Sequence, residues 1–456
     1  MSTSVRRLLD FLRSDDIPWL ARTSFRLERC HMAAWGVFAG LIEGRTSRIV
    51  VAKTFEGSPL LITFVVATPM LANLLSLVWS VAVRGRSRRR LFILLASAAI
   101  ASFASVGLTP SGWIPWGGWV FAAQLALAHV FLAGIINVRT SMWTLNYPQA
   151  FRARITGRLQ GLRFLMALIA GAATALLFNA DASHYRWVYP LIGAVAVLSL
   201  APMRRMPVRG ERRVRRQHRE RQRAQGARRR GLLGGLRESA AILREDRAFA
   251  RYCTAQYLLG SAWLMMETVL TIVITTRLGL GFFTSALLLE IIPSLALLAC
   301  LSLWARYFDR VGVLRFRVVN SLNWFLAMAL GLLGLVALVP GGYWGYAAAV
   351  TLLGLSAVLV GSGRAGGAIA WNLGHLHFAS PHNAELYMGI HVALTGLRGV
   401  IMPFVGWAAL VWLDWGAALI ACALAAIGGW MFHRLARDAG RNASVPADPL
   451  ATEDGV

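Results

Sequence analysis

The sequence predicts an all-α membrane protein in which twelve transmembrane helices form two pseudo-symmetric six-helix bundles. Hydrophobic residues make up 57% of the chain and charged residues only 15%, whereas a soluble domain carries roughly 25% charged residues. Apolar runs of about 20 residues, the length that crosses the hydrocarbon core of a bilayer, recur along the chain. The chain also contains an internal repeat, which indicates that one bundle is a duplicate of the other.

The repeat consists of two blocks with slightly different shifts. The first block has a shift of 224 (249 − 25) and aligns Phe25, Gly36, Glu43, Lys53, Gly57 and Pro69 with Phe249, Gly260, Glu267, Arg277, Gly281 and Pro293. The second has a shift of 235 (398 − 163) and aligns Gly161-Leu162-Arg163 and Gly171 with Gly396-Leu397-Arg398 and Gly406. Both copies run in the same direction, so we expect the bundles to be related by an axis along the membrane normal.

The predicted spans divide evenly between the two bundles. They lie at residues 31–52, 59–83, 91–109, 117–138, 157–179, 186–203, 252–276, 282–304, 317–339, 343–363, 386–411 and 414–433. The first six form an N-terminal bundle at 31–203, and the last six form a C-terminal bundle at 252–433.

The loops between these spans alternate in charge. Loops after odd-numbered spans are short and poor in arginine, whereas loops after even-numbered spans are basic; the loop at 84–90 reads RGRSRRR. The positive-inside rule therefore places the basic loops and both termini in the cytoplasm. We expect a multi-pass protein of the cell (inner) membrane.

Three segments lie outside the predicted spans. Residues 1–30 form a cytoplasmic tail that is either a short amphipathic helix on the membrane surface or an unstructured tail. Residues 204–251 form a basic linker; its first part, 204–230, holds 13 arginines and two glutamates and is either a tether to anionic lipid or a solvated connection. Residues 434–456 form the cytoplasmic C-terminal tail.

The net charge of +26 does not indicate nucleic-acid binding. The chain has 47 basic residues, of which Lys53 is the one lysine, and such a bias is typical of codon usage rather than of selection for phosphate contacts. The positive charge also lies in loops, where the positive-inside rule expects it. The four cysteines, Cys30, Cys253, Cys300 and Cys422, lie in or beside apolar runs, and we interpret them as small buried residues.

Two six-helix halves joined by a long basic linker resemble the major facilitator superfamily (MFS) of transporters. That family carries a signature of the form G-x-x-x-D-R-x-G-R-[RK] after its second helix and again after its eighth. Here the loop after span eight reads ARYFDRVG, in which Asp309, Arg310 and Gly312 match the D-R-x-G core. The resemblance implies that these three residues form a conformational latch. The loop after span two has no aspartate, so the chain resembles a divergent member.

Charged side chains within apolar runs are the candidate functional residues, because charges in a bilayer are costly and usually functional. Three carboxylates lie well inside such runs: Glu43, Glu267 and Glu290. Two arginines, Arg163 and Arg398, lie at similar depth. The first and fifth helices of each half are neighbours in the MFS, which implies two duplicated ion pairs, Glu43–Arg163 and Glu267–Arg398. Such pairs either hold helices together or bind a charged substrate and a coupling proton.

Three charges within the predicted spans have no counterpart in the other half of the repeat. They are Arg45, Arg48 and Glu290. Because duplicated charges suit a structural role and a substrate site is often asymmetric, we expect these three to determine substrate specificity. The other polar residues within spans, such as Asn320, Asn323 and His391, are interpreted as interhelical hydrogen bonds.

The histidines near the tenth and eleventh spans do not predict a metal site. His375 and His377 would point about 200° apart on a helix, and no cysteine or carboxylate near them or near His382 and His391 completes a zinc site. The chain also lacks a phosphate-binding Gly-Lys-Ser/Thr loop and a nucleophile–His–Asp arrangement. We therefore expect neither an enzyme, nor an ATP-driven pump, nor a cofactor.

These observations favour a secondary active transporter that moves a small solute by alternating access and is coupled to H⁺. Its partners would be the lipid bilayer, the solute and protons, and we expect a monomer. The alternative is an MFS-like membrane protein that no longer transports and serves in assembly or sensing. The incomplete signature after span two favours this alternative, whereas the costly charges within the spans count against it.

Overall fold

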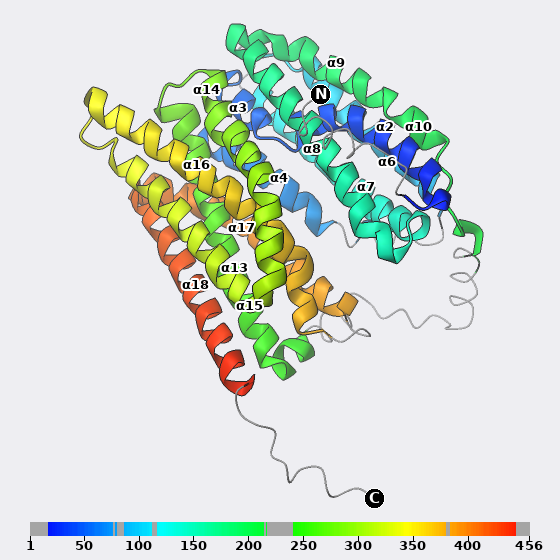
Figure 1. The fold of residues 1–456 in the computed structure, drawn as a ribbon. Helices are drawn as coiled ribbons and strands as arrows, with labels where there is room; N and C mark the ends of the chain where they lie inside the picture. Colours follow the sequence, from blue (N-terminus) through cyan, green and yellow to red (C-terminus); the bar gives the residue numbers. More distant parts are fainter. Residues whose placement is uncertain are drawn as a thin grey trace, which may run out of the picture. The chain divides into compact units, whose positions relative to one another are not determined.

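A computed structural model describes residues 17–75, 78–79, 86–111, 116–213, 216, 240–379 and 384–443 (Figure 1). Residues 1–16, His382, most of the basic linker and the end of the C-terminal tail lie outside these ranges. The described residues form helices joined by short turns and contain no strand. The predicted all-α membrane fold class is confirmed.

The chain divides into two compact units, which are described separately. The first comprises Met1–Arg229 and Leu270–Ile291, and the second comprises Arg230–Val269 and Ile292–Val456. The boundary between them therefore falls inside helix α13 (Arg247–Ile272).

The first unit consists of one long stretch of chain and one short one. Its helices are α2 (Trp19–Ile42), α3 (Thr46–Lys53), α4 (Pro59–Leu74), α6 (Arg88–Ala104), η1 (Ser105–Leu108), α7 (Gly117–Asn146), α8 (Gln149–Ala180), η2 (Ala182–His184), α9 (Tyr185–Leu198), α10 (Leu200–Arg204), η3 (Val273–Arg277), α14 (Phe282–Ala286) and η4 (Leu287–Ile291). Helix α2 packs along α8 and α9, and α6 packs along α7 (Figure 1).

The first predicted span is not one continuous helix. Helix α2 begins at Trp19, twelve residues before the predicted start (31 − 19), and ends at Ile42, while α3 begins at Thr46. Gly44 lies in the turn between them, where a Cβ atom would lie 2.1 Å from the carbonyl oxygen of Gly40. The chain can turn this tightly because glycine has no side chain.

The short stretch of the first unit, 270–291, contacts α3 and α8 through polar groups. Lys53 donates from Nζ to the carbonyl oxygen of Leu280, and the Asn179 side-chain oxygen accepts from the backbone N–H of Phe283 at 3.3 Å. The ring of Phe282 lies beside Phe178, with centroids 5.9 Å apart. Two π-helical turns, η3 and η4, occur in this stretch, and such turns are frequent at functional sites.

The second unit is built on long helices. They are the main part of α13, then α15 (Ile292–Val336), α16 (Gly342–Leu373), η5 (Gly374–His377), α17 (Ala384–Leu413) and α18 (Gly416–Ala443). Helix α15 packs along α16 and α18 (Figure 1). Asn320 and Asn323 on α15 donate to the carbonyl oxygens of Gly363 and Leu359 on α16, which confirms the predicted interhelical hydrogen bonds at these two asparagines.

Helix α15 contains the D-R-x-G sequence and bends at its glycine. Gly312 has φ 72° and ψ 175°, although the residues on both sides are helical. This backbone conformation is essentially restricted to glycine. The stretch Phe282–Val336 is 55 residues long, far more than the about 20 residues of one crossing, so the bend at Gly312 separates two of the predicted spans.

Nine stretches of the described chain are long and apolar enough to cross a membrane. Counting both sides of Gly312 adds one, and α2 and the shorter apolar helix α4 add two more, which is consistent with twelve crossings. The exact number stays a prediction. The chain is a multi-pass membrane protein.

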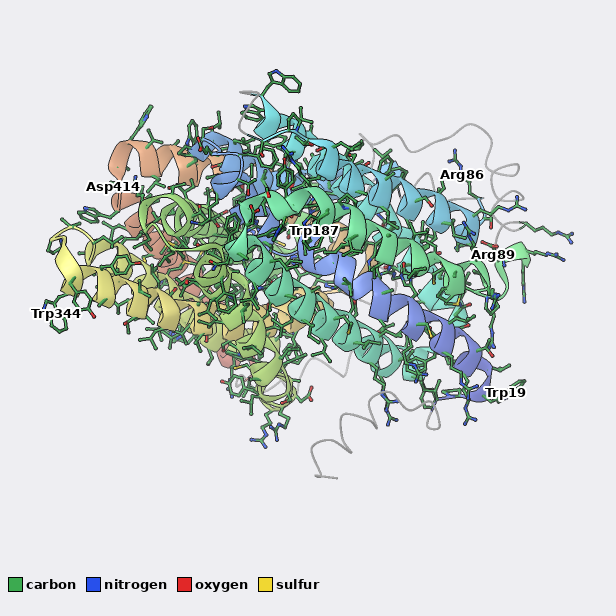
Figure 2. The ribbon with its side chains drawn as sticks, turned by 90° about the horizontal axis from the view of Figure 1, so that it is seen from above. Trp19, Arg86, Arg89, Trp187, Trp344 and Asp414 are labelled. Atoms are coloured by element: carbon green, nitrogen blue, oxygen red, sulfur yellow. The ribbon has the colours of Figure 1, made fainter. Side chains whose placement is uncertain are left out.

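Exposed tryptophans mark the ends of the long helices. Trp19 begins α2 and is 75% exposed, and Trp344 lies in the first turn of α16 and is 82% exposed. Figure 2 shows Trp19 at the same end of the first unit as Arg86 and Arg89. Tryptophan and arginine at a helix end are typical of a membrane–water interface.

The four cysteines are free thiols, but they are not all buried. Cys253 and Cys422 are buried, Cys300 is intermediate and Cys30 is exposed. The prediction of small buried residues is therefore wrong for Cys30, whose position on α2 leaves it exposed.

Gly312→Ala should lower the melting temperature of the purified protein, because a Cβ at this φ and ψ is strained by on the order of 1–3 kcal/mol. The matched control is Gly157→Ala in α8, where a Cβ would meet no atom within 4 Å and alanine should raise stability by up to about 1 kcal/mol. Scanning fluorimetry in detergent measures both. An equal effect of the two substitutions would show that α15 does not need glycine at its bend.

Candidate functional site

The charges predicted within the first unit gather at the break between α2 and α3. Glu43 follows the last residue of α2, and Arg45 precedes the first residue of α3. Each reaches a partner on a different element, Arg163 on α8 and Glu290 on η4. We refer to these four residues as the break cluster.

The first ion pair of the break cluster joins α2 to α8. Arg163 donates from Nη1 to Oε2 of Glu43, and from Nε to the side-chain oxygen of Gln160 at 2.7 Å. The Phe164 ring lies 4.5 Å from the guanidinium carbon. The Arg163 side chain is 9% exposed and that of Glu43 is 33% exposed. The predicted Glu43–Arg163 pair is therefore confirmed, with the carboxylate as its accessible member.

Small residues on α2 allow this pair to form. A Cβ on Gly36 would lie 2.7 Å from the Arg163 carbonyl oxygen, and a Cβ on Gly40 would lie 2.5 Å from that of Ala167. The spacing Gly36-x-x-x-Gly40 is the small-residue pattern that lets two membrane helices approach closely. The backbone of α8 at Arg163 is therefore in direct contact with α2.

The second ion pair joins the start of α3 to the π-helical turn η4. The backbone N–H of Arg45 donates to Oε2 of Glu290 at 3.1 Å, and Arg45 Nη1 lies 3.7 Å from the same oxygen. Arg45 Nη1 also donates to the carbonyl oxygen of Leu289 at 2.7 Å. Because the first N–H groups of a helix attract anions, Glu290 is held by both a helix terminus and a guanidinium group.

Two of the three residues without counterparts in the repeat, Arg45 and Glu290, are therefore in contact. Sequence reasoning singled out Arg45 and Glu290 but did not predict that they pair. Arg48 lies one turn after Arg45 on α3 and is 9% exposed. Its predicted role in specificity is untested by this geometry.

In the second unit the predicted Glu267–Arg398 pair is wrong. Arg398 donates from Nη1 to the carbonyl oxygen of Gln256 at 2.5 Å, eleven residues before Glu267 on α13 (267 − 256). At 1.5 Å per residue this separation is about 16 Å along the helix, beyond the reach of a glutamate side chain. Both residues are nevertheless buried, at 9% and 8% exposure.

The predicted latch residues lie at the bend of α15. Asp309 and Arg310 are exposed in the turn that precedes Gly312. Their conformational role is not tested by this arrangement.

Metal ligation finds no support in the described part of the chain. None of its His, Cys, Asp and Glu side chains form a group of three or more that could hold a metal ion. The His375 and His391 rings do lie near each other, with stacked centroids 6.5 Å apart.

Sequence reasoning missed a buried polar network in the first unit. Glu28, only 3% exposed, accepts hydrogen bonds from Trp143 Nε1 at 2.5 Å and from the Tyr147 hydroxyl at 2.6 Å. Arg139 donates to Nε2 of His31 at 3.0 Å and lies close enough to Glu28 to attract its charge. The network was missed because the first span was predicted to begin at residue 31, which placed Glu28 in the tail, whereas α2 begins at Trp19.

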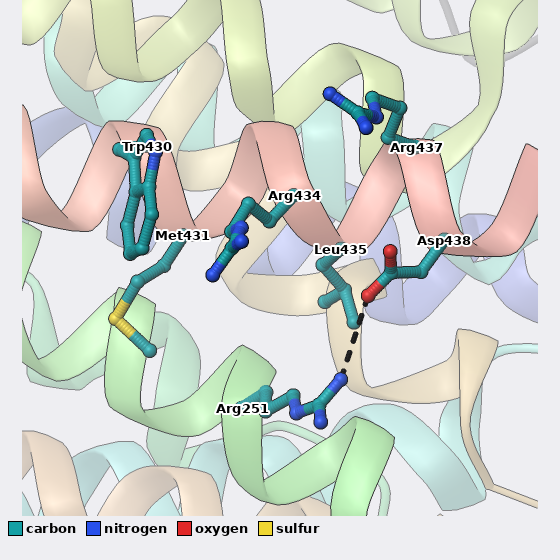
Figure 3. Close-up of a pocket in the computed structure, with 7 residues that line it drawn as sticks. All are labelled: Arg251, Trp430, Met431, Arg434, Leu435, Arg437 and Asp438. Carbon is teal, nitrogen blue, oxygen red and sulfur yellow. Dashed lines mark hydrogen bonds and ion pairs between the residues drawn. The ribbon is translucent and has the colours of Figure 1, made fainter.

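A surface pocket of about 430 Å³ lies in the second unit between α13 and α18 (Figure 3). Its lining includes Trp430, Arg434 and Arg437, together with an ion pair between Arg251 and Asp438 at 3.5 Å. Both members of this pair are more than half exposed, so the pair contributes little to stability. The pocket contains none of the predicted site residues.

No protein-family model matches the chain, and no curated protein matches its sequence. Solved structures do match its fold. The crystal structure of the nucleoside transporter NupG has a TM-score of 0.62 and 13% identity, covering 92% of this chain and 99% of that chain. The xylose transporter XylE from E. coli, in an inward open conformation, has a TM-score of 0.62 and 13% identity, with coverages of 90% and 95%.

A third similar structure is that of a POT family transporter in complex with 5-aminolevulinic acid. Its TM-score is 0.62 at 12% identity, and the match covers 92% of this chain and 96% of that chain. Identities this low establish the fold alone. The chain has the fold of MFS transporters, as the sequence resemblance implied.

A double-mutant cycle with Glu43→Gln and Arg163→Gln should give a coupling free energy of roughly 1–3 kcal/mol, because each single change leaves a partly buried charge without its partner. The control cycle, Arg251→Gln with Asp438→Asn, should give less than about 1 kcal/mol, because both side chains are exposed. Unfolding free energies in mixed micelles measure both cycles. Equal coupling in the two cycles would contradict a stabilising buried pair at the break.

Proposed function

We propose that the protein is a secondary active transporter of the cell membrane that moves a small anionic or zwitterionic solute by alternating access, driven by a proton gradient. The observation that carries this proposal is the break between α2 and α3, where two ion pairs meet an interrupted helix. Interrupted membrane helices with charged groups at their ends are typical of solute and coupling-ion sites in transporters.

The break divides the first predicted span into a long helix and a short one. Helix α2 has 24 residues and α3 has eight, which correspond to about 36 Å and about 12 Å at 1.5 Å per residue. A charged site at an interrupted helix can be exposed to each side of the membrane in turn as the halves rock.

Glu43 is our first candidate for the proton carrier. It is the more accessible member of its pair, so water can deliver a proton to it. A proton on Glu43 removes the negative charge that Arg163 faces, and an anionic group of the solute then takes its place at the guanidinium. Release of the solute and the proton on the other side restores the ion pair.

The remaining charges have supporting roles in this proposal. Arg45 and Arg48 bind the solute from α3, and Glu290 orients Arg45 through the contacts described above. Glu267 and Arg398, from the second unit, are a further proton carrier and anion contact. Asp309, Arg310 and Gly312 form the conformational latch that the family resemblance implies.

The fold neighbours support a small solute as cargo. Their names describe a nucleoside transporter, a xylose transporter and a POT family transporter in complex with 5-aminolevulinic acid. These cargoes differ in chemistry, so the solute of this chain is argued from its own charges. Both termini in the cytoplasm and a monomeric state complete the proposal.

The proposal predicts that Glu43→Gln abolishes proton-driven accumulation but keeps solute exchange, because glutamine imitates the protonated carboxylate and cannot release a proton. A thermal-shift screen of anionic and zwitterionic metabolites first identifies the solute. Proteoliposomes with an imposed pH gradient then measure accumulation, and the same vesicles without a gradient measure exchange of labelled for unlabelled solute.

The control for this experiment is Asp438→Asn, which removes an exposed carboxylate at the end of α18 and should change neither measurement. Glu267→Gln and Glu290→Gln are tested in parallel. If all three neutral variants accumulate solute as the unmodified protein does, coupling through these glutamates is excluded. A complete screen without any ligand would favour the assembly or sensing role.

A further inference from the structure

The second unit contains a buried cluster of cationic and aromatic side chains that the proposed transport mechanism does not use as a group. It consists of Tyr252 and Gln256 on α13, Arg317 on α15, His375 on η5, and His391 and Arg398 on α17. We refer to these six residues as the cationic cluster.

Contacts join the residues of the cationic cluster in pairs, and the charges of its arginines connect the pairs. Arg398 donates to the backbone carbonyl of Gln256, and the guanidinium carbon of Arg317 lies 5.8 Å from the Tyr252 ring centroid. The His375 and His391 rings stack at 6.5 Å. The two arginines lie close enough to repel each other, and both act electrostatically on His391.

The cluster is buried, and many of its polar atoms lack partners. Arg317 is 2% exposed, Arg398 8%, Tyr252 0% and His391 2%. Among the residues that the structure describes, no hydrogen-bond partner reaches Nε and Nη2 of Arg317, Nε of Arg398, the Tyr252 hydroxyl, Nδ1 of His375 or Nε2 of His391. Buried polar groups are nearly always paired, so several donors unpaired at one place indicate that a ligand completes their hydrogen bonds.

The internal repeat shows what the cluster is missing. The shift of 224 that aligns Phe25 with Phe249 also aligns Glu28 with Tyr252 (252 − 28). In the first unit Glu28 is the carboxylate that faces the buried Arg139. In the second unit a tyrosine takes its place, although two buried arginines are present.

Aromatic rings compensate the buried charges only in part. The guanidinium carbon of Arg317 lies 4.6 Å from the Phe432 ring centroid as well as near Tyr252. Cation–π contacts are weaker than the desolvation cost of a buried ion. Among the described side chains neither arginine contacts a carboxylate, so an anion from outside the chain would relieve both the desolvation cost and the mutual repulsion.

We propose that the cationic cluster binds a small phosphate-type oxyanion within the second unit. Guanidinium groups match the oxygen atoms of phosphate with paired hydrogen bonds, and the Tyr252 hydroxyl and a neutral imidazole add neutral donors. The anion takes the place that the Glu28 carboxylate has in the first unit. Binding there would stabilise the second unit whether or not the chain transports a solute.

A soluble anion fits this site better than a lipid headgroup. The two arginines and Tyr252 are each at least nine-tenths buried, and an enclosed site suits a small ion better than a headgroup with two acyl chains attached. The experiment therefore separates the two sources.

The first test measures binding of inorganic phosphate to the purified full-length protein. Phosphate should raise the melting temperature by roughly 2–4 °C relative to chloride at equal ionic strength, and equilibrium dialysis with labelled phosphate should show saturable binding. Arg317→Gln and Arg398→Gln should each weaken binding at least about tenfold, the loss expected for one charge-assisted hydrogen bond. Arg434→Gln, which changes an exposed arginine on α18, is the control and should bind as the unmodified protein does.

The second test restores the carboxylate that the repeat lacks. Tyr252→Glu should bind phosphate at least about tenfold more weakly, because its own carboxylate neutralises the arginines, whereas Tyr252→Phe should lose only the contribution of one hydroxyl. This variant keeps both arginines, so its result does not depend on the folding of the glutamine variants.

Three results would overturn the proposal. The first is the absence of saturable phosphate binding by the unmodified protein. The second is phosphate binding by both glutamine variants that equals that of the unmodified protein. The third is a rise in melting temperature that appears in nanodiscs with anionic phospholipid but not with soluble phosphate. None of these measurements uses transport. Failure here would therefore leave the proposed transport function standing, and failure of transport would leave this site standing.

Discussion

The close approach of the first and fifth helices of each half is the constraint on which the other features depend. In the first unit the missing side chain of Gly36 lets α2 contact the backbone of α8 at Arg163. In the second unit a Cβ on Gly260 would lie 2.1 Å from the guanidinium carbon of Arg398. Both glycines and both arginines are aligned by the repeat. The aligned glycine therefore makes room for the backbone of Arg163 in the first unit and for the guanidinium group of Arg398 in the second.

The two arginine side chains reach in opposite directions along the first helix of their halves. Arg163 extends to Glu43, seven residues after Gly36 (43 − 36), whereas Arg398 extends to the carbonyl oxygen of Gln256, four residues before Gly260 (260 − 256). A carboxylate neutralises the first arginine, and a backbone dipole only partly compensates the second. The two aligned arginines therefore differ in their electrostatic surroundings.

Much of the fold could be predicted from the sequence because it depends on long, strongly apolar runs and on a repeat. The Glu43–Arg163 pair was predictable because the resemblance to the MFS implies that the first and fifth helices of a half are neighbours, and because residue spacing placed the two charges at similar depth. The Glu267–Arg398 pair failed because depth along a helix does not determine which way a flexible arginine extends. The break at Gly44 and the bend at Gly312 are changes in backbone conformation, which an apolar run in the sequence does not indicate.

Sequence reasoning missed two buried polar groups because of their positions relative to the predicted spans. Glu28 and Arg317 lie at or beyond the predicted ends of spans, where charges are expected to be solvated. In the structure the helices continue past those ends and pack against each other, so these charges are buried. Helix ends are the least reliable part of any prediction from hydropathy, and here they contain both buried networks.

The break between α2 and α3 holds its two carboxylates in different ways. Glu43 is held by one arginine, and its side chain is 33% exposed. Glu290 accepts from a backbone N–H as well as facing Arg45, and its side chain is only 17% exposed. Loss of the Glu43–Arg163 pair would therefore release α8 from the break while α3 stays attached to η4, and this asymmetry would give a directed change within the first unit.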